Sequence, residues 1–215
     1  MPKPKVYISR AVNAAVLARL DQICETRGWA GAGRCPEEVL AKEVGDVAAV
    51  LGTDRWTAEL MDKAPHLRII ALTAVGYDSV DVAAATKRGI VVTNTAGSLT
   101  DTVADLALAL MLAVARRVPE MERWTRAGKW QTVGVTPMGK DLHHATLGIV
   151  GLGRIGEAVA DRARAFHMQV LYHDTVRREE LERRHGYRFV TLDALLAASR
   201  SEEHTSELQS PECIS

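Results

Sequence analysis

The chain has 215 residues, 47% of them hydrophobic, and its 27 basic residues balance its 27 acidic ones. This balance gives no reason to expect a nucleic-acid or membrane partner, and no run approaches the roughly 18 apolar residues of a membrane-spanning helix. The start, MPKPKVYISR, lacks the apolar core of a signal peptide, and Cys24 and Cys35 have no metal-binding spacing. We therefore expect a cytoplasmic globular protein of one or two domains without a metal site.

Strands and helices are predicted to alternate along the first half of the chain. Short apolar runs predict strands, and amphipathic segments predict the helices between them. We expect strands at 6–9, 47–51, 67–72 and 90–92, and helices at 14–27, 56–63 and 82–87. Gly89 is placed to cap the last of these helices. Such alternation is typical of a parallel sheet with helical crossovers.

A longer helix is predicted to begin at Thr100 or Asp101, either of which can cap it. Additional apolar residues such as Leu108 flank its main stripe, so we expect this helix to be buried on more than one side. The stripe itself is predicted to consist of Val103, Leu106, Ala107, Leu110, Met111 and Val114. Pro119 is expected to break or kink the helix, and 128–140 is predicted to be a loop.

The most informative stretch is 147–174, LGIVGLGRIGEAVADRARAFHMQVLYHD. It combines a strand, a glycine-rich turn, a helix, a second strand and a final acid, which is the order of a dinucleotide-binding βαβ unit. Gly151 permits the tight turn, Gly153 lets the backbone approach a pyrophosphate, and Gly156 lets the helix pack close to the strand. The apolar stripe of this helix is predicted to contain Ile155, Val159, Ala163 and Phe166.

The acid at the end of the second strand, Asp174, bears on the choice of cofactor. Its carboxylate would accept hydrogen bonds from the adenosine ribose and repel a 2′-phosphate, which favours NAD over NADP. Arg177 and Arg178 follow closely and would work against that preference.

After this unit we expect a helix at 177–184, a short strand at 188–190 and the start of a helix at 192–198. The last residues, 200–215 (RSEEHTSELQSPECIS), differ in character from the rest and resemble the translation of a short-read sequencing adapter. We therefore expect the native sequence to end near Ser199 and the protein to be a fragment of a longer one.

Three blocks in this order resemble the D-2-hydroxyacid dehydrogenase family, particularly its glyoxylate/hydroxypyruvate reductase branch. They are TAVGYDSVDVAAATKRGIVVTNTAG (73–97), LTDTVADLALALMLAVARR (99–117) and DLHHATLGIVGLGRIG (141–156). The seventeen residues between Gly156 and Asp174 also match the family's spacing. The resemblance covers nearly all of 5–199. It implies an α/β fold with parallel sheets, in which a flavodoxin-like substrate domain is followed by an incomplete Rossmann NAD-binding domain.

The domain boundaries that follow are 1–98 for the substrate domain, which would lack its C-terminal return helix, and 99–199 for the first half of the NAD-binding domain. Residues 200–215 would be a non-native tail. Ala96 stands where the family commonly has proline, which would loosen the hinge without removing a chemical group.

The resemblance also implies site residues. Backbone N–H groups of Val75 and Gly76 would bind the substrate carboxylate, whereas the residues without the resemblance favour an ordinary strand-end turn. Thr102 would lie near the nicotinamide. The remaining cofactor-binding residues would be those of the glycine loop and the acid: Gly151, Gly153, Arg154, Ile155, Gly156 and Asp174.

No catalytic residue is assigned within the chain. The family uses an arginine, a glutamate and a histidine for hydride transfer, and all three lie past the position that matches Ser199. His143 and His144 are interpreted as loop histidines, and His173 either lines the adenosine pocket or is a solvated strand-end residue. We therefore expect the fragment to be inactive on its own.

The function predicted from the resemblance is hydride transfer between NAD(H), less readily NADP(H), and a small 2-oxo acid such as glyoxylate or hydroxypyruvate, giving a D-2-hydroxy acid. A phosphite- or formate-oxidising enzyme and an NAD(H)-responsive, non-enzymatic corepressor-like protein are alternatives. The intact protein is expected to be a homodimer through the helix at 101–117, unless that helix is buried within one subunit. Which 2-oxo acid is preferred cannot be predicted from these residues.

Overall fold

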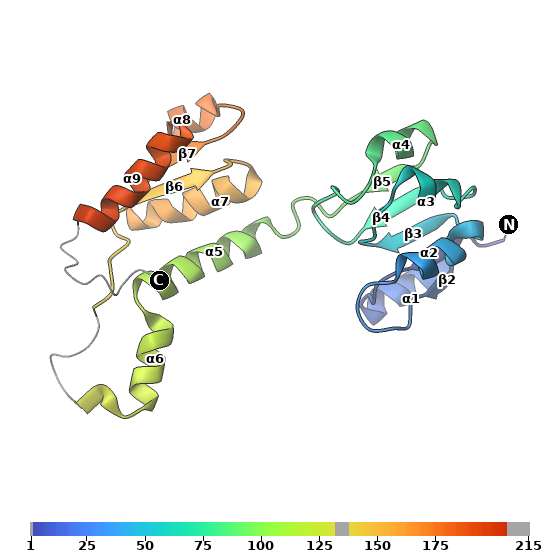
Figure 1. Cartoon of the computed structure of the whole chain (residues 1–215), viewed down its shortest axis with the longest axis horizontal. Helices are drawn as coiled ribbons and strands as arrows, with labels where there is room; N and C mark the ends of the chain where they lie inside the picture. The colour runs from blue at the N-terminus through green and yellow to red at the C-terminus, as the bar shows by residue number, and fades with distance from the viewer. Residues whose placement is uncertain (1, 132–137, 206–215) are drawn as a thin grey trace. The chain divides into compact units, whose positions relative to one another are not determined.

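The computed structural model describes residues 2–131 and 138–205, and the side chains of 2–130 and 138–199. It comprises two compact units, Met1–Leu99 and Thr100–Ser215 (Figure 1). Within the described ranges, no helix is long and apolar enough to cross a membrane. Of the predicted adapter-like tail, the side chains of 200–205 and all of 206–215 lie outside the described residues.

The first unit is built on a five-stranded parallel sheet with the order β2-β1-β3-β4-β5. Its strands are β1 (Lys5–Ile8), β2 (Glu25–Gly28), β3 (Ala49–Gly52), β4 (Ile69–Leu72) and β5 (Val91–Thr93). This is the flavodoxin-like order, so the predicted fold class is confirmed. β2 lies on one side of β1 and β3 lies on the other, so the strand order reverses between β1 and β3. Ligands of open α/β sheets bind at such a point.

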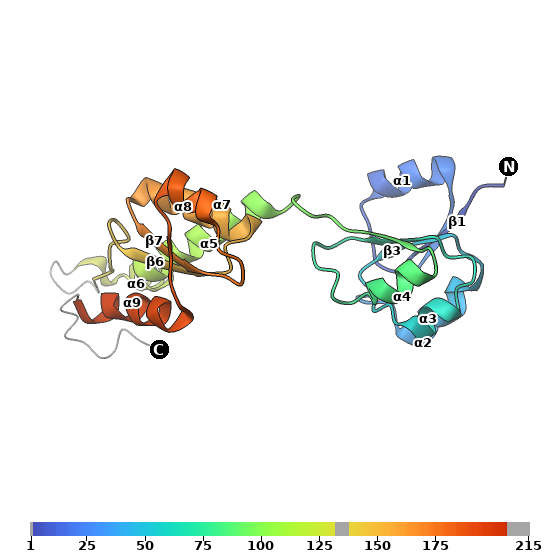
Figure 2. The same cartoon turned by 90° about the horizontal axis from the view of Figure 1, so that it is seen from above.

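Helices cover both faces of this sheet. α1 (Ala14–Ile23) lies on one face, whereas α2 (Glu37–Glu43), α3 (Ala58–Asp62) and α4 (Val82–Lys87) lie on the other (Figure 2). The predicted cap at Gly89 is confirmed. Gly89 follows Arg88, the C-cap residue of α4, and has a left-handed φ of +69°. The core between sheet and helices contains fully buried Leu40, Val50, Trp56, Met61 and Ile70.

The first unit differs from the prediction in two places. The helix predicted at 14–27 ends at Ile23, because Cys24 is extended and Glu25–Gly28 pair with β1 as the edge strand β2. The side chains of this strand are polar and largely exposed, so they carry no apolar alternation. α2 was not predicted at all, although Pro36 at its start and acidic residues in its first turn are helix signals.

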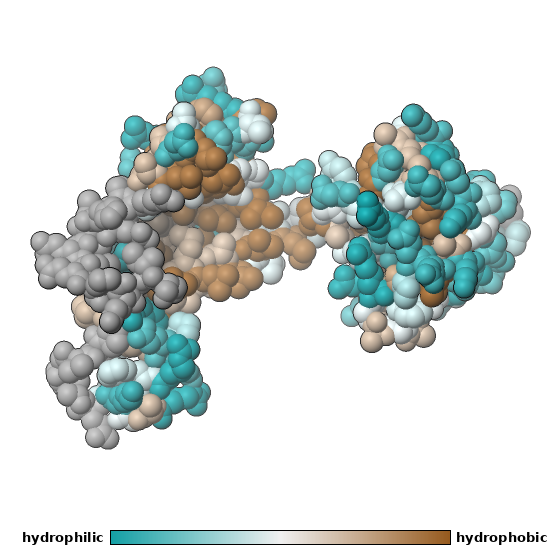
Figure 3. Space-filling model, in the orientation of Figure 1, coloured by the Kyte–Doolittle hydropathy of each residue, from teal (hydrophilic) through white to brown (hydrophobic). Residues whose placement is uncertain are grey.

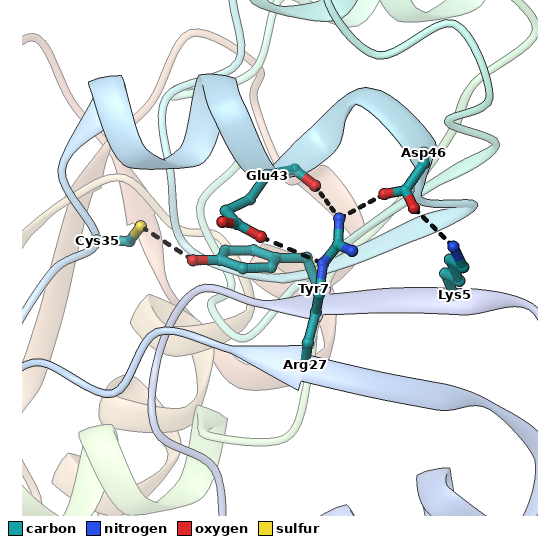
Figure 4. Close-up of polar contacts among 6 residues, drawn as sticks. All are labelled: Lys5, Tyr7, Arg27, Cys35, Glu43 and Asp46. Atoms are coloured by element: carbon teal, nitrogen blue, oxygen red, sulfur yellow. Dashed lines mark hydrogen bonds and ion pairs between the residues drawn. The ribbon is translucent and has the colours of Figure 1, made fainter.

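A cluster of charged side chains joins the strands at this edge (Figure 4). Lys5 Nζ donates to Asp46 Oδ2 at 2.7 Å, and Arg27 pairs with the other oxygen of the same carboxylate. Lys5, followed by Arg27, lowers the pKa of Asp46 to about 2. Beneath this cluster, the Tyr7 hydroxyl lies 3.7 Å from the Cys35 sulfur, and burial raises the pKa of that thiol. These contacts tie the edge strand to the core.

The second unit contains a three-stranded parallel sheet with the order β6-β7-β8. Its strands are β6 (Thr146–Val150), β7 (Gln169–His173) and β8 (Arg188–Phe189). α7 (Arg154–Ala163) connects the first two strands, and α8 (Glu179–His185) connects the last two. This order is one half of a doubly wound nucleotide-binding sheet, as predicted for an incomplete Rossmann domain.

The helix predicted at 192–198 is present as α9 (Leu192–Thr205) and packs along β6. Its close approach depends on Gly148 in that strand. A Cβ atom at this position would lie 2.5 Å from the Ser199 hydroxyl and 2.8 Å from Leu195. Glycine is therefore required here because the helix occupies the space of a side chain.

The stripe predicted for α7 is partly wrong. Ile155 is 39% exposed, whereas Ala160 and Ala163 are completely buried. Small residues face the sheet because the helix packs close to it, and hydrophobicity alone does not identify them.

The long helix α5 (Thr100–Ala115) is followed by α6 (Val118–Arg126) and a 3-10 turn, Lys129–Gln131. The helix breaks where Arg117 takes a left-handed φ of +53°, and Pro119 lies in the first turn of α6. A proline there costs no helical hydrogen bond. The proline thus begins the second helix rather than kinking the first.

The face of α5 that packs within its unit contains the buried residues Ala104 and Leu108, and Met111 packs against the hydrophobic core of that unit. Most of the predicted stripe instead forms an exposed apolar surface (Figure 3). Its exposed members are Val103, Leu106, Leu110 and Val114. We call these four residues the outer face of α5.

Candidate functional site

The glycine loop of the second unit joins the end of β6 to the start of α7. Gly151 has a φ of +90°, a conformation that favours glycine, and it turns the chain sharply after Val150. Gly153 is the extended N-cap of α7, and no side chain caps the helix there. The first N–H groups of the helix are therefore available to an anion.

The other glycines of this loop have different surroundings. A Cβ atom on Gly153 would meet no protein atom within 4 Å, so the space above this residue is open. A Cβ atom on Gly156 would lie 2.3 Å from the backbone oxygen of Gly151. Gly156 is thus needed for packing, whereas Gly153 leaves room for a ligand. The loop fits a pyrophosphate group.

Asp174, at the end of β7, is bound to this loop. Its Oδ2 accepts a hydrogen bond of 2.8 Å from the Leu152 N–H, and its Oδ1 accepts from the Val176 N–H at 3.3 Å. These backbone donors, Val176 first, lower the pKa of the Asp174 carboxyl. The acid therefore stays ionised at neutral pH and lies beside the glycine loop.

A second polar network fixes the segment that follows Asp174. The Tyr172 hydroxyl donates to Glu182 at 2.8 Å and accepts from the Arg178 N–H at 2.7 Å. Arg177 binds the same glutamate with two hydrogen bonds, of 2.9 and 2.8 Å. This network joins β7 to α8 and was missed by the sequence analysis, since no local pattern links these residues.

α5 packs against α7 beside this site. Arg162 of α7 holds the first turns of α5, because it donates to Asp105 at 2.6 Å and to Asp101 at 3.0 Å. Thr102 lies in the same first turn with an exposed side chain.

In the first unit, Val75 and Gly76 lie in an exposed loop after β4. Asn94 donates to the Val75 carbonyl at 2.7 Å, and the Thr95 N–H donates to Ala74 at 3.0 Å. Among the described residues, the N–H groups of Val75 and Gly76 donate no hydrogen bond. They are therefore free to bind an anion. The sequence analysis did not identify Asn94 as the residue that positions this loop.

A cavity of about 360 Å³ opens beside the carboxyl ends of β1 and β3. Buried Ser9 donates to buried Asp54 beneath it, and the Arg34 guanidinium donates to the Thr53 carbonyl at 2.7 Å. With Arg10 and Gly33, these residues line the cavity. It lies where the strand order of the sheet reverses, and sequence reasoning did not identify it.

Three histidines lie together outside the glycine loop. The rings of His143, His144 and His167 are 4.1 to 5.6 Å apart, and all three residues are exposed. His173 is tied to the Val190 carbonyl at 3.0 Å and stacks on Phe189. Within 2–130 and 138–199, no three or more His, Cys, Asp or Glu side chains are grouped so that they could hold a metal ion.

The structure thus brings together the predicted residues of the glycine loop and Asp174 within one unit. Thr102 lies on a helix packed against α7, and Val75 and Gly76 belong to the other unit.

Comparison with known proteins agrees with this arrangement. Residues 108–201 match the family model described as D-isomer specific 2-hydroxyacid dehydrogenase, NAD binding domain. A glyoxylate reductase from Korarchaeum cryptofilum is 46% identical over 202 residues, which cover 92% of this chain and 60% of the relative. A glyoxylate reductase from Pyrococcus horikoshii is 44% identical over 204 residues, which cover 92% of this chain and 61% of that relative. The chain spans about 60% of the length of these curated relatives.

Solved structures show the same likeness. A crystal structure of a protein from Thermus thermophilus has a TM-score of 0.80 and 42% identity, covering 91% of this chain and 62% of that one. Another is the structure of an NADPH-dependent glyoxylate/hydroxypyruvate reductase from Sinorhizobium meliloti in complex with NADP and malonate. It has a TM-score of 0.74 and 38% identity, and the match covers 87% of this chain and 57% of that one. With both parallel sheets and the glycine loop in place, the chain is similar in sequence and in fold to the D-isomer-specific 2-hydroxyacid dehydrogenase family.

Proposed function

We propose that this protein carries the cofactor loop and the carboxylate-binding loop of a reductase that transfers hydride between NAD(H) and a small 2-oxo acid, giving a D-2-hydroxy acid. The observation that carries the proposal is the open glycine loop at the N-terminus of α7, with Asp174 hydrogen-bonded to it. Relatives named glyoxylate reductase at 44–46% identity support glyoxylate as the substrate, and a solved structure named glyoxylate/hydroxypyruvate reductase supports hydroxypyruvate as a second candidate.

Each residue of the site has a physical part in this proposal. The N–H groups of Gly153, Arg154 and Ile155 would bind the pyrophosphate, because the start of a helix presents unpaired donors and a positive dipole end. The outward lone pairs of Asp174 would accept hydrogen bonds from the ribose hydroxyls and disfavour a 2′-phosphate, so we propose NAD as the preferred cofactor. The bound nicotinamide supplies the hydride.

The substrate would be held by its carboxylate. The free N–H groups of Val75 and Gly76 can both donate to one anion, and Asn94 keeps their loop in place. Thr102 would contribute from the first turn of α5. The outer face of α5 would be covered by a second copy of the protein, so we also propose a homodimer.

Catalysis itself requires a proton donor at the substrate carbonyl. No histidine among the described residues hydrogen-bonds to a carboxylate, and the three clustered histidines lie on loops outside the glycine loop. We therefore propose that the 215-residue chain binds NADH without reducing glyoxylate.

The test is a titration of the 215-residue chain with NADH, followed by fluorescence, together with an assay of glyoxylate-dependent NADH oxidation. Asp174→Asn should raise the Kd for NADH roughly 10- to 100-fold, because it removes charge-assisted hydrogen bonds of about 1.5–3 kcal/mol. Glu180→Gln, an exposed charge change on α8, should leave the Kd unchanged. The proposal fails if the chain does not bind NADH, or if the Asp174 variant binds it as well as the original.

A further inference from the structure

Two arginines follow Asp174, and in the nucleotide-binding fold an arginine near this position accommodates the 2′-phosphate of NADP. Such an arginine must have a guanidinium that is free to form paired hydrogen bonds with phosphate oxygens. The availability of Arg177 and Arg178 therefore decides how the site treats NADPH.

Arg177 is not available. Its Nε donates to Glu182 Oε1 at 2.9 Å and its Nη2 donates to Oε2 at 2.8 Å, so both oxygens of the carboxylate grip one guanidinium. The guanidinium also lies over the ring of Phe189, with its carbon 5.8 Å from the ring centre. This two-point geometry is the one with which an arginine would otherwise bind a phosphate.

Glu182 is itself held in place. Its side chain is only 17% exposed, and its Oε1 accepts a hydrogen bond of 2.8 Å from the Tyr172 hydroxyl. Tyr172 is completely buried in β7, and its hydroxyl accepts from the Arg178 N–H at 2.7 Å, which fixes the start of α8. Arg177, and then Tyr172, lower the pKa of Glu182 to about 2, so the carboxylate is ionised at neutral pH.

We infer that Glu182 is a specificity-determining residue for the cofactor, because it binds Arg177 and so withholds that guanidinium from a 2′-phosphate. Two groups then disfavour NADPH. Asp174 repels the additional phosphate directly, and Glu182 removes one of the two arginines that would compensate. This inference rests on the proposed function, since it concerns discrimination between two forms of the proposed cofactor.

The experiment compares the affinities of the 215-residue chain for NADH and NADPH. Glu182→Gln keeps an acceptor for the Tyr172 hydroxyl but removes the charge that holds Arg177. We expect its Kd for NADPH to fall about tenfold or more, since a released guanidinium forms charge-assisted bonds with phosphate. The Kd for NADH should change less than about threefold, because a ribose without the 2′-phosphate offers the arginine no charge.

Matched variants test the role of Arg177. Arg177→Met in the Glu182→Gln background should abolish the gain in NADPH affinity, whereas Arg178→Met should not. Glu179→Gln serves as the control. It weakens the exposed ion pair between Glu179 and Arg183 of the same helix, whose N–O distance is 3.6 Å, and should leave both affinities unchanged. Circular dichroism of every variant checks that the fold is retained.

The outcomes separate the inference from the function on which it rests. A chain that does not bind NADH overturns the proposed function, and the inference with it. Normal NADH binding with an unchanged NADPH-to-NADH ratio in Glu182→Gln overturns the inference alone. So does a gain that survives Arg177→Met.

Discussion

At the scale of single residues, the glycines of the loop serve different purposes although they belong to one motif. Gly151 supplies a left-handed turn, Gly156 allows a close contact within the protein, and Gly153 leaves open space. Only the last of these bears directly on a ligand. Substitutions to alanine should therefore separate folding from binding.

Gly153→Ala should preserve the fold and weaken NADH binding. Its φ of −80° suits any residue, and the added methyl group meets no protein atom within 4 Å, so the free energy of unfolding should change by less than about 0.5 kcal/mol. The methyl group would occupy the space proposed for the pyrophosphate, so we expect the Kd for NADH to rise at least tenfold. Unchanged affinity would show that the cofactor lies elsewhere.

Gly156→Ala serves as the comparison, and urea unfolding is the measurement for both variants. Alanine is intrinsically better in a helix by about 1 kcal/mol. At this position, however, its Cβ atom would lie 2.3 Å from a backbone oxygen that cannot rotate away. Overpacking of this kind costs about 1–3 kcal/mol, so we expect net destabilisation. A more stable variant would contradict the close packing of α7 on the loop.

At the scale of elements, α5 has two apolar faces that differ in burial. One face, which includes Ala104 and Leu108, is buried within its unit, and the outer face is exposed. Leu106 and Leu110 are each 57% exposed on this outer face. A helix that is apolar on more than one side is normally covered on more than one side. The proposed homodimer supplies that cover.

Leu110→Glu should weaken self-association without unfolding the unit, because it places a charge on the outer face. Sedimentation at micromolar concentration measures the change. Leu108→Ala, on the buried face, should instead destabilise the fold by about 2–5 kcal/mol. If the original chain already sediments as a monomer, the dimer through α5 is excluded.

At the scale of the whole molecule, the described residues form two hydrophobic cores with no residue in common. Leu40 is central to the first core and Leu152 to the second, and each is only 1% exposed. Substitutions in separate cores normally have additive effects on stability. Each unit should therefore respond to its own mutations.

Leu40→Ala should lower the stability of the first unit by about 2–5 kcal/mol, and Leu152→Ala should do the same in the second. Hydrogen exchange resolved by peptide is the measurement. Protection should fall only in the unit that carries the substitution. Loss of protection in both units from either change would show that they unfold together.

The sequence by itself determined the local parts of this protein. The glycine loop, its flanking strands and Asp174 were predicted because the constraints on them act between residues that are close along the chain. The helix at 82–87 was predicted for the same reason, since Gly89 marks its end two residues further on. The three sequence blocks that resemble the family, found in the same order, predicted the fold class of both units.

Only the tertiary structure decided the remainder, because the partners are distant in sequence. Glu25–Gly28 is a strand because it pairs with β1, and nothing within those polar residues signals it. Ala104 and Leu108 of α5 are buried because α7 packs against that side of α5. Larger apolar residues of α5, such as Leu106, lie on the outer face instead. Arg177 and Glu182 are only five residues apart, but their pairing depends on how α8 packs on β7, where buried Tyr172 binds the same glutamate.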